Sequence, residues 1–214
     1  MGKYAVEFIG TFFLALTVGV SAVLGLGGPF APLAIGTVLM VMIYAGGHIS
    51  GAHYNPAVTV GVFLRGRCEA KDVGPYIVAQ VLGGVVAAVL TTSVFAGASA
   101  TPVTITAAKF HSMPAVLLSE LLFTFALVYV VLNVATSKRT EGNSYFGLAI
   151  GFTVLVGAIT VGSISLGGFN PAVSTSLIVE GKLAAADCWM HFVPQLVGGA
   201  LAGFTFNGLN PDDR

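Results

Sequence analysis

The chain has 214 residues, of which 56% are apolar and 8% are charged, and its nine basic and nine acidic side chains cancel to a formal net charge of zero. Soluble domains carry about 25% charged residues, so this composition excludes an ordinary soluble protein. No run of basic residues indicates a nucleic-acid partner. The composition predicts one integral membrane domain over residues 1–214, in contact with lipid.

Six apolar stretches approach the ~20 residues that a helix needs to cross a hydrocarbon core of about 30 Å. They cover residues 4–25, 32–48, 73–95, 114–136, 145–163 and 186–206. The first stretch is long, carries Glu7 near its start and lacks a clear cleavage site, so we interpret it as a span and not as a signal peptide. The predicted fold class is an all-α membrane protein with six transmembrane helices.

The basic side chains predict how this bundle is oriented. If the N-terminus is cytoplasmic, that side collects seven of the nine, namely Lys3, Arg65, Arg67, Lys71, Lys138, Arg139 and Arg214, and the other side keeps Lys109 and Lys182. Loops on the cytoplasmic side carry an excess of Lys and Arg. We therefore expect both termini in the cytoplasm and the protein in the plasma membrane.

The triplet Asn-Pro-Ala occurs twice, at Asn55-Pro56-Ala57 and at Asn170-Pro171-Ala172. Asn is a preferred N-cap residue, and Pro at the first helical position loses only an N–H group that has no intrahelical partner. Each triplet therefore predicts a helix start, with helices from Asn55 to about Leu64 and from Asn170 to about Val179. At 1.5 Å per residue each is ~15 Å long, half the hydrocarbon thickness, so they enter from opposite faces and meet.

Matching residues recur at an offset of 115 or within two residues of it, which indicates an internal repeat. The pairs are the two triplets, Gln80 and Gln195, Gly83-Gly84 and Gly198-Gly199 at an offset of 115, and Glu7 and Glu120 at an offset of 113. Each copy, over approximately 1–96 and 114–214, holds three spans and one half-helix, and an extracellular loop joins them. Because three is odd, the copies cross the membrane in opposite directions and place the functional site at their interface.

The half-helices predict a pore for neutral molecules. Glycine-rich approaches over 46–54 and 162–169 leave backbone carbonyls free to line a narrow path. The amide groups of Asn55 and Asn170 offer N–H donors at the centre while their oxygens cap their own helices. The positive ends of the two half-helices oppose cations, so we expect such a pore to reject protons and ions.

Several polar residues in the spans require a role, because ionisable groups inside a membrane are costly. For Glu7 and Glu120 we favour hydrogen bonds to backbone N–H groups of the loops over proton coupling or surface placement, and for Gln80 and Gln195 donation to the same loops. His48 and His53 either brace the first loop or line the cytoplasmic vestibule, and His111 and His191 are expected at the surface or in packing. Cys68 and Cys188 are expected to be unpaired, and no metal site is predicted.

The segments His48–Thr59 and Gly168–Ser174 resemble the two signature loops of the major intrinsic proteins, the aquaporins, and the resemblance covers essentially the whole chain. It implies a homotetramer with one pore per subunit that conducts water or small uncharged solutes passively. It also implies a second constriction formed by four side chains, which here are Ile35, Ala158, Gly167 and Val173. Strict water channels typically have an aromatic residue, a histidine, a small residue and an arginine there, so the resemblance implies an atypical member without the arginine.

The unusual constriction predicts a permissive channel for water and for ammonia, hydrogen peroxide, urea or similar solutes. The loop over 96–113 offers Thr104, Thr106 and His111 as further side chains for the outer mouth. A strictly water-selective channel is the alternative within the family. An ion-coupled secondary transporter and a purely structural junction protein are the alternatives outside it, and nothing in the sequence indicates an enzyme or a cofactor.

Overall fold

The computed structural model describes residues 1–98, 103–110 and 112–213, and these residues form helices and loops without strands. The long helices are α1 (Gly2–Val18), α2 (Ala31–Ser50), α4 (Ala70–Leu90), α6 (Met113–Val131), α7 (Phe146–Ser165) and α9 (Trp189–Leu209). The short helices are α3 (Pro56–Leu64), α5 (Ala96–Ala98) and α8 (Pro171–Val179). The π-helical segments η1 (Gly19–Val23), η3 (Thr91–Phe95) and η4 (Leu132–Thr136) continue α1, α4 and α6, and η2 (Gly28–Phe30), η5 (Lys138–Thr140) and η6 (Ala185–Asp187) are 3₁₀ turns.

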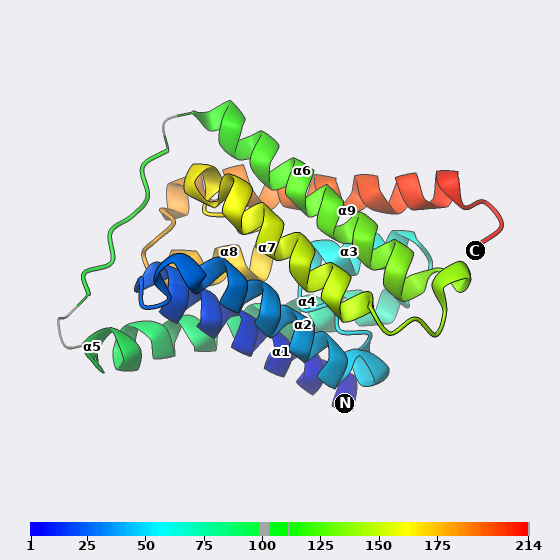
Figure 1. Ribbon diagram of the computed structural model, residues 1–214, viewed down its shortest axis with the longest axis horizontal. Helices are drawn as coiled ribbons and strands as arrows, with labels where there is room; N and C mark the ends of the chain where they lie inside the picture. Colours follow the sequence, from blue (N-terminus) through cyan, green and yellow to red (C-terminus); the bar gives the residue numbers. More distant parts are fainter. Residues whose placement is uncertain (99–102, 111, 214) are drawn as a thin grey trace.

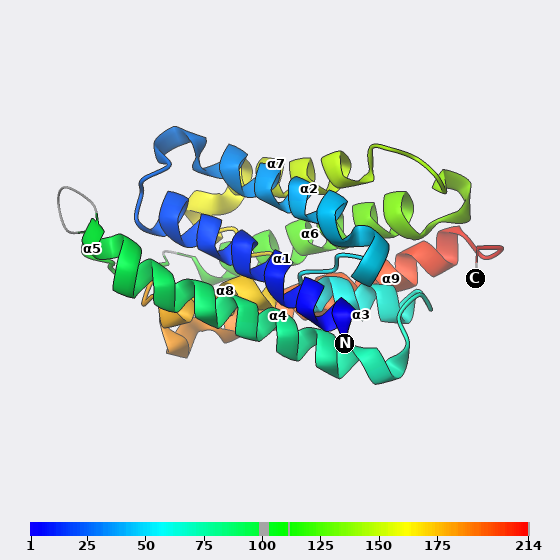
Figure 2. The ribbon, with the colours of Figure 1, turned by 90° about the horizontal axis from the view of Figure 1, so that it is seen from below.

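The long helices pack side by side into a bundle, with both termini at one end and α5 at the other (Figure 1). We call these the terminal end and the distal end. The short helices α3 and α8 lie end to end in the middle of the bundle, α3 toward the terminal end and α8 toward the distal end, as the view turned by 90° also shows (Figure 2). The described residues therefore form the six long helices and two half-helices expected from the sequence.

The expected spans agree with the helices to within a few residues. Among the described residues, five helices with their π-helical or 3₁₀ extensions are long and apolar enough to cross a membrane: 2–23, 28–50, 70–95, 113–136 and 146–165. The sixth, α9, has 21 residues and carries Gln195 and Asn207, and it packs along α6. Large apolar side chains such as Leu122, Ile159 and Phe204 are exposed on the outside of the bundle, where lipid would contact them.

The prediction of irregular approaches over 46–54 and 162–169 is wrong at its N-terminal side. Helix α2 continues to Ser50 and α7 to Ser165, so the non-helical approaches are residues 51–54 and 166–169. Helix α2 ends where Gly51 adopts a left-handed conformation, and α7 ends in the same way at Leu166. Gly46 is therefore part of α2, and its missing side chain leaves room for the Tyr54 hydroxyl and Val6.

Glycine pairs at equivalent positions let the long helices approach the half-helices. A Cβ atom on Gly84 would lie 2.7 Å from the carbonyl oxygen of Ala172, and one on Gly199 would collide with the carbonyl oxygen of Ala57. The neighbouring Gly83 and Gly198 bring α4 onto α1 and α9 onto α6 in the same manner. This close packing, which is typical of membrane helices, seats both half-helices inside the bundle.

Candidate functional site

The two Asn-Pro-Ala triplets meet at the centre of the molecule. Asn55 and Asn170 are the N-caps of α3 and α8: the Asn55 Oδ1 atom accepts a hydrogen bond from the Ala57 amide at 2.8 Å, and the Asn170 Oδ1 atom accepts one from the Ala172 amide at 2.9 Å. The Asn55 Nδ2 group donates to the carbonyl of Phe169, and the Asn170 Nδ2 group donates to that of Tyr54, both at 2.8 Å. Each asparagine is thus tied to the opposite loop.

This arrangement leaves donors available for a molecule in the pore. An asparagine amide carries two N–H groups, and the contacts within the described residues use one on each side chain. Both side chains are buried in the protein and line a central cavity. The second N–H groups are therefore free to bind an acceptor such as a water oxygen at the point where the positive ends of the two half-helices converge.

The Glu7 carboxylate holds the first approach loop in place. Its Oε1 atom accepts hydrogen bonds from the Ser50 hydroxyl at 2.7 Å and the His53 amide at 2.9 Å, and its Oε2 atom accepts one from the Tyr54 amide at 2.7 Å. Gln80 donates to the same Oε2 atom at 2.8 Å. One buried carboxylate therefore satisfies backbone N–H groups that would otherwise be unpaired inside the membrane.

Glu120 does the same for the second loop. Its carboxylate accepts hydrogen bonds from the Ser165 hydroxyl at 2.6 Å, the Gly168 amide at 3.0 Å, the Phe169 amide at 2.8 Å and Gln195 at 2.7 Å. The partners correspond one by one to those of Glu7. The residues that match between the two halves of the sequence therefore also form matching hydrogen bonds in the structure.

The two glutamines differ in part from the prediction. Gln80 and Gln195 do not donate to the loop backbone; each donates to its glutamate and to a hydroxyl on the adjacent half-helix, Thr59 at 3.0 Å and Ser174 at 2.9 Å. They therefore link the carboxylate to the half-helix. The prediction from the sequence considered only the backbone of the loops as the partner of the glutamines. It did not consider the hydroxyl groups on α3 and α8.

Tight backbone conformations shape both loops. Tyr54 and Phe169, each just before an asparagine, have φ angles of 50° and 46°, and Ala52 and Leu166 have φ angles of 52° and 72°. Residues with side chains rarely adopt such values, and the cost is of order 1–3 kcal/mol each. The carboxylate contacts described above supply the restraint that keeps these conformations populated.

A cavity of about 250 Å³ runs through this site. It extends from Val23 and Pro32 near the distal end, past both asparagines, to Ile43 and His53. All four predicted constriction residues line it, namely Ile35, Ala158, Gly167 and Val173. Most of its wall is aliphatic, with Leu14, Val18, Leu39, Leu127 and Val154 among the lining residues.

A second cavity of about 560 Å³ opens at the terminal end. It shares Ile43, Ala52, His53, Val131 and Ile150 with the first cavity, so the two adjoin at these residues. His48 lines this second cavity and is exposed, and no bracing contact of its side chain is seen among the described residues. His53 is buried, lies 3.1 Å from the Thr59 hydroxyl and packs edge-on against Tyr76, so it both braces the loop and lines the path.

The other histidines, the two loop threonines and the two cysteines were also named in the sequence analysis. His191 is fully buried, with its Nδ1 atom 3.3 Å from the Ser174 hydroxyl, so packing is correct for it and surface placement is wrong. Thr104 and Thr106 are exposed and do not line the central cavity. His111 lies outside the described residues. Cys68 and Cys188 are free thiols.

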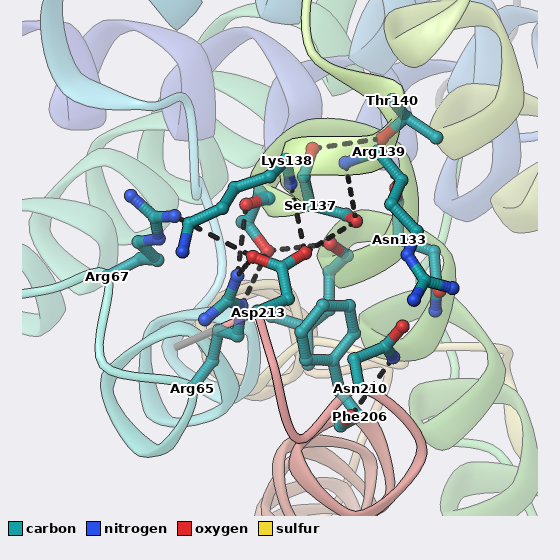
Figure 3. Close-up of polar contacts among 12 residues, drawn as sticks. Arg65, Arg67, Asn133, Ser137, Lys138, Arg139, Thr140, Phe206, Asn210 and Asp213 are labelled. Atoms are coloured by element: carbon teal, nitrogen blue, oxygen red, sulfur yellow. Dashed lines mark hydrogen bonds and ion pairs between the residues drawn. The ribbon is translucent and has the colours of Figure 1, made fainter.

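A cluster at the terminal end was not expected from the sequence (Figure 3). The buried Arg65 guanidinium lies 2.8 Å from the Asp213 carboxylate and 4.4 Å from the centre of the Phe206 ring. Asp213 also accepts hydrogen bonds from the Ser137 hydroxyl at 2.7 Å and the Lys138 amide at 2.9 Å. The Ser137 hydrogen bond, with the Lys138 amide and Arg65, holds the pKa of Asp213 below its ordinary value of 3.8.

Glu180 occupies the equivalent position in the other half, at the same offset of 115 from Arg65. Both residues are C-caps of their half-helices and both are buried. Glu180 packs toward Gly19 and Thr91, yet it forms no salt bridge with any described basic side chain. The sequence analysis missed these two positions, and their offset of 115 is the signal that could have identified them.

Comparisons with known proteins agree with the geometry. The profile of the family described as "Major intrinsic protein" matches residues 1–206. The chain is 35% identical to an "Aquaporin Z" of Bradyrhizobium diazoefficiens, over 99% of this chain and 95% of that one, and 35% identical to a "Glycerol uptake facilitator protein-like 6" of Lactiplantibacillus plantarum, over 100% of both.

A solved structure shows the same fold. The aquaglyceroporin from Plasmodium falciparum superposes with a TM-score of 0.78 at 24% identity, covering 95% of this chain and 94% of that one. With the match over residues 1–206 and the paired half-helices, the chain belongs to the major intrinsic protein family, a family of membrane channels and not of enzymes.

Proposed function

We propose that this protein is a passive channel for water and for small neutral solutes such as ammonia, hydrogen peroxide or urea. One observation carries the proposal: the four constriction positions, which are aliphatic or glycine, line the same cavity as Asn55 and Asn170. A wall without bulky or charged side chains at these positions removes the steric filter against molecules larger than water. It also offers few hydrogen-bond donors, which favours solutes with little hydration to lose.

The same centre supports exclusion of ions and protons. A water molecule that accepts hydrogen bonds from both asparagine Nδ2 groups has its oxygen oriented, so it cannot pass a proton along a chain of waters. The N-terminal ends of α3 and α8 add a positive potential there, and about half a unit charge is assigned to each helix end. Cations therefore meet an electrostatic barrier in addition to the cost of desolvation.

A strictly water-selective channel is the second candidate within the family. The names of the relatives point in both directions, because one is an "Aquaporin Z" and another is a "Glycerol uptake facilitator protein-like 6". The aliphatic constriction favours the permissive reading. Coupled transport is not favoured, because the two intramembrane glutamates are each occupied by four hydrogen bonds.

Assembly and orientation complete the proposal. We expect a homotetramer with one pore in each subunit, and the exposed apolar side chains of the bundle leave surface for both neighbours and lipid. With Arg65, Arg67, Lys138 and Arg139 at the terminal end, we expect that end to face the cytoplasm of the plasma membrane. A reporter fused to the C-terminus would test the orientation.

Purified protein in liposomes tests the function. Stopped-flow light scattering would follow water, urea and glycerol gradients, and a pH dye inside the vesicles would follow ammonia. We expect faster water and ammonia or urea flux than in empty vesicles, without dependence on a sodium or proton gradient. No increase for any solute would exclude a channel, and an increase for water alone would exclude the permissive constriction.

A single variant isolates the constriction. Val173→Arg places a long cationic donor in the cavity, so we expect urea flux to fall more than water flux. Val179→Arg is the matched control, because Val179 lies at the end of the same half-helix and is exposed outside this cavity. Equal loss of both fluxes in Val173→Arg would indicate simple blockage.

A further inference from the structure

Lys182 is the one lysine or arginine among the described residues that line the central cavity, and no aspartate or glutamate lines it. The same wall includes the apolar residues Val23, Pro32 and Leu177. A lysine side chain ordinarily extends into water, whereas this residue is only partly exposed. A full charge in an otherwise uncharged wall makes a large contribution to the local potential.

The main chain holds Lys182 at this position. Helix α8 ends in a Schellman motif: the Gly181 amide donates to the carbonyl of Ile178 at 3.0 Å, and the Lys182 amide donates to that of Leu177 at 2.8 Å. Gly181 adopts the required left-handed conformation, with φ at 75°. The Lys182 carbonyl in turn accepts a hydrogen bond from the Ala108 amide at 2.9 Å, so the distal loop fixes it from the other side.

No acidic group among the described residues neutralises this charge. The Lys182 ammonium takes part in none of the salt bridges or side-chain hydrogen bonds of the described chain. The nearest acid in sequence, Glu180, is buried toward Gly19 and Thr91. The field of the lysine therefore acts on whatever enters the cavity from the distal end.

We propose that Lys182 is a specificity-determining residue of the pore, whose ammonium group repels cations at the distal mouth and donates hydrogen bonds to neutral solutes before they reach the aliphatic section. The proposal rests on the channel function proposed above. It gives the pore a cationic barrier at its mouth in addition to the half-helix ends at its centre.

The test replaces the charge and then restores it chemically. In a Cys68→Ser/Cys188→Ser background, Lys182→Cys removes the ammonium, aminoethyl methanethiosulfonate rebuilds one at nearly the same length, and methyl methanethiosulfonate adds a neutral group of smaller size. Sodium leak into liposomes is followed with a sodium-sensitive dye, and water flux by stopped-flow. Lys109→Cys is the control, because Lys109 is an exposed cation of the distal loop that does not line the cavity.

We expect Lys182→Cys to raise sodium leak by roughly five- to tenfold, the effect of a unit charge about 8 Å from the path at an effective dielectric constant of about 30–40. Water flux should stay within about twofold, because it depends on the asparagine pair and the aliphatic wall. Aminoethylation should return the leak to the parent level, and methylthiolation should not. Lys109→Cys should match the parent before and after both reagents.

The two proposals fail in different ways. A parent protein that conducts no water overturns the channel function itself. A conducting parent whose sodium leak is unchanged in Lys182→Cys, or whose leak falls equally with both reagents, overturns only the role of Lys182. If Lys182→Cys does not yield monodisperse protein, Lys182→Gln is measured for the same leak, and an unchanged leak in that variant overturns the role as well.

Discussion

Replacing Glu120 by Gln is expected to destabilise the protein and to stop conduction, although the two side chains have nearly the same shape. The carboxylate accepts four hydrogen bonds, two at each oxygen. An amide accepts at its oxygen only and presents N–H donors at the other position. Whichever way the new amide points, it faces the Gly168 amide or the Phe169 amide donor to donor, and that backbone N–H loses its partner.

The expected cost follows from these contacts. Hydrogen bonds to a charged group contribute about 1.5–3 kcal/mol each, and a buried donor left unpaired costs about 1–3 kcal/mol. The Ser165 hydroxyl or the Gln195 amide can reorient, so we count one charge-assisted bond lost and one orphaned amide, or about 3–6 kcal/mol. That is a large part of the 5–15 kcal/mol by which a typical protein is stable.

Thermal unfolding in detergent and water flux in liposomes measure the outcome. At about 2–4 °C per kcal/mol for a chain of this size, Tm should fall by roughly 6–24 °C. Glu7→Gln should behave alike, because its partners are equivalent. Glu69→Gln is the control: its ion pair with Lys71 is exposed and contributes little. A Glu120→Gln protein with Tm within about 2 °C of the parent and normal water flux would refute the reasoning.

Three further predictions concern other contacts. Gly199→Ala should displace α3, because its Cβ atom would collide with the Ala57 carbonyl, and should abolish water flux, whereas Gly208→Ala on the same helix meets nothing and should leave Tm and flux unchanged. Asp213→Asn should lower Tm at neutral pH. Because the folded pKa of Asp213 lies below its ordinary value of 3.8, the stabilisation is fully present well above pH 3.8 and is lost as the pH falls through the folded pKa, so the difference in Tm between variant and parent should vanish there in a series of melting curves. Glu180→Gln should raise or preserve Tm with normal water flux, because a buried carboxylate without a cationic partner is costly, and a large drop in Tm would show an unrecognised partner.

Much of the fold could be predicted because its signals are local or periodic. Asn55 and Asn170 specify helix starts through their own side chains, and each is followed by a proline at the first helical position. The spans were evident from continuous apolar runs, and the repeat from identical residues at one offset. The ends of α2 and α7 were misjudged, because a glycine such as Gly46 tolerates both a helix and a loop, and the sequence does not show which side chains pack against it, here Tyr54 and Val6.

The sequence by itself indicated a membrane protein with an internal repeat, placed the starts of its half-helices at the asparagines, and predicted which four residues stand at the expected constriction. Only the tertiary structure decided which groups satisfy the buried polar atoms. Gln80 bonds to Glu7 and Thr59, Asp213 is paired with Arg65, and Lys182 lines the cavity. The physical reason is that capping and hydropathy act between neighbours in the chain, whereas the partner of a buried donor or charge is set by the packing of elements that are far apart in sequence.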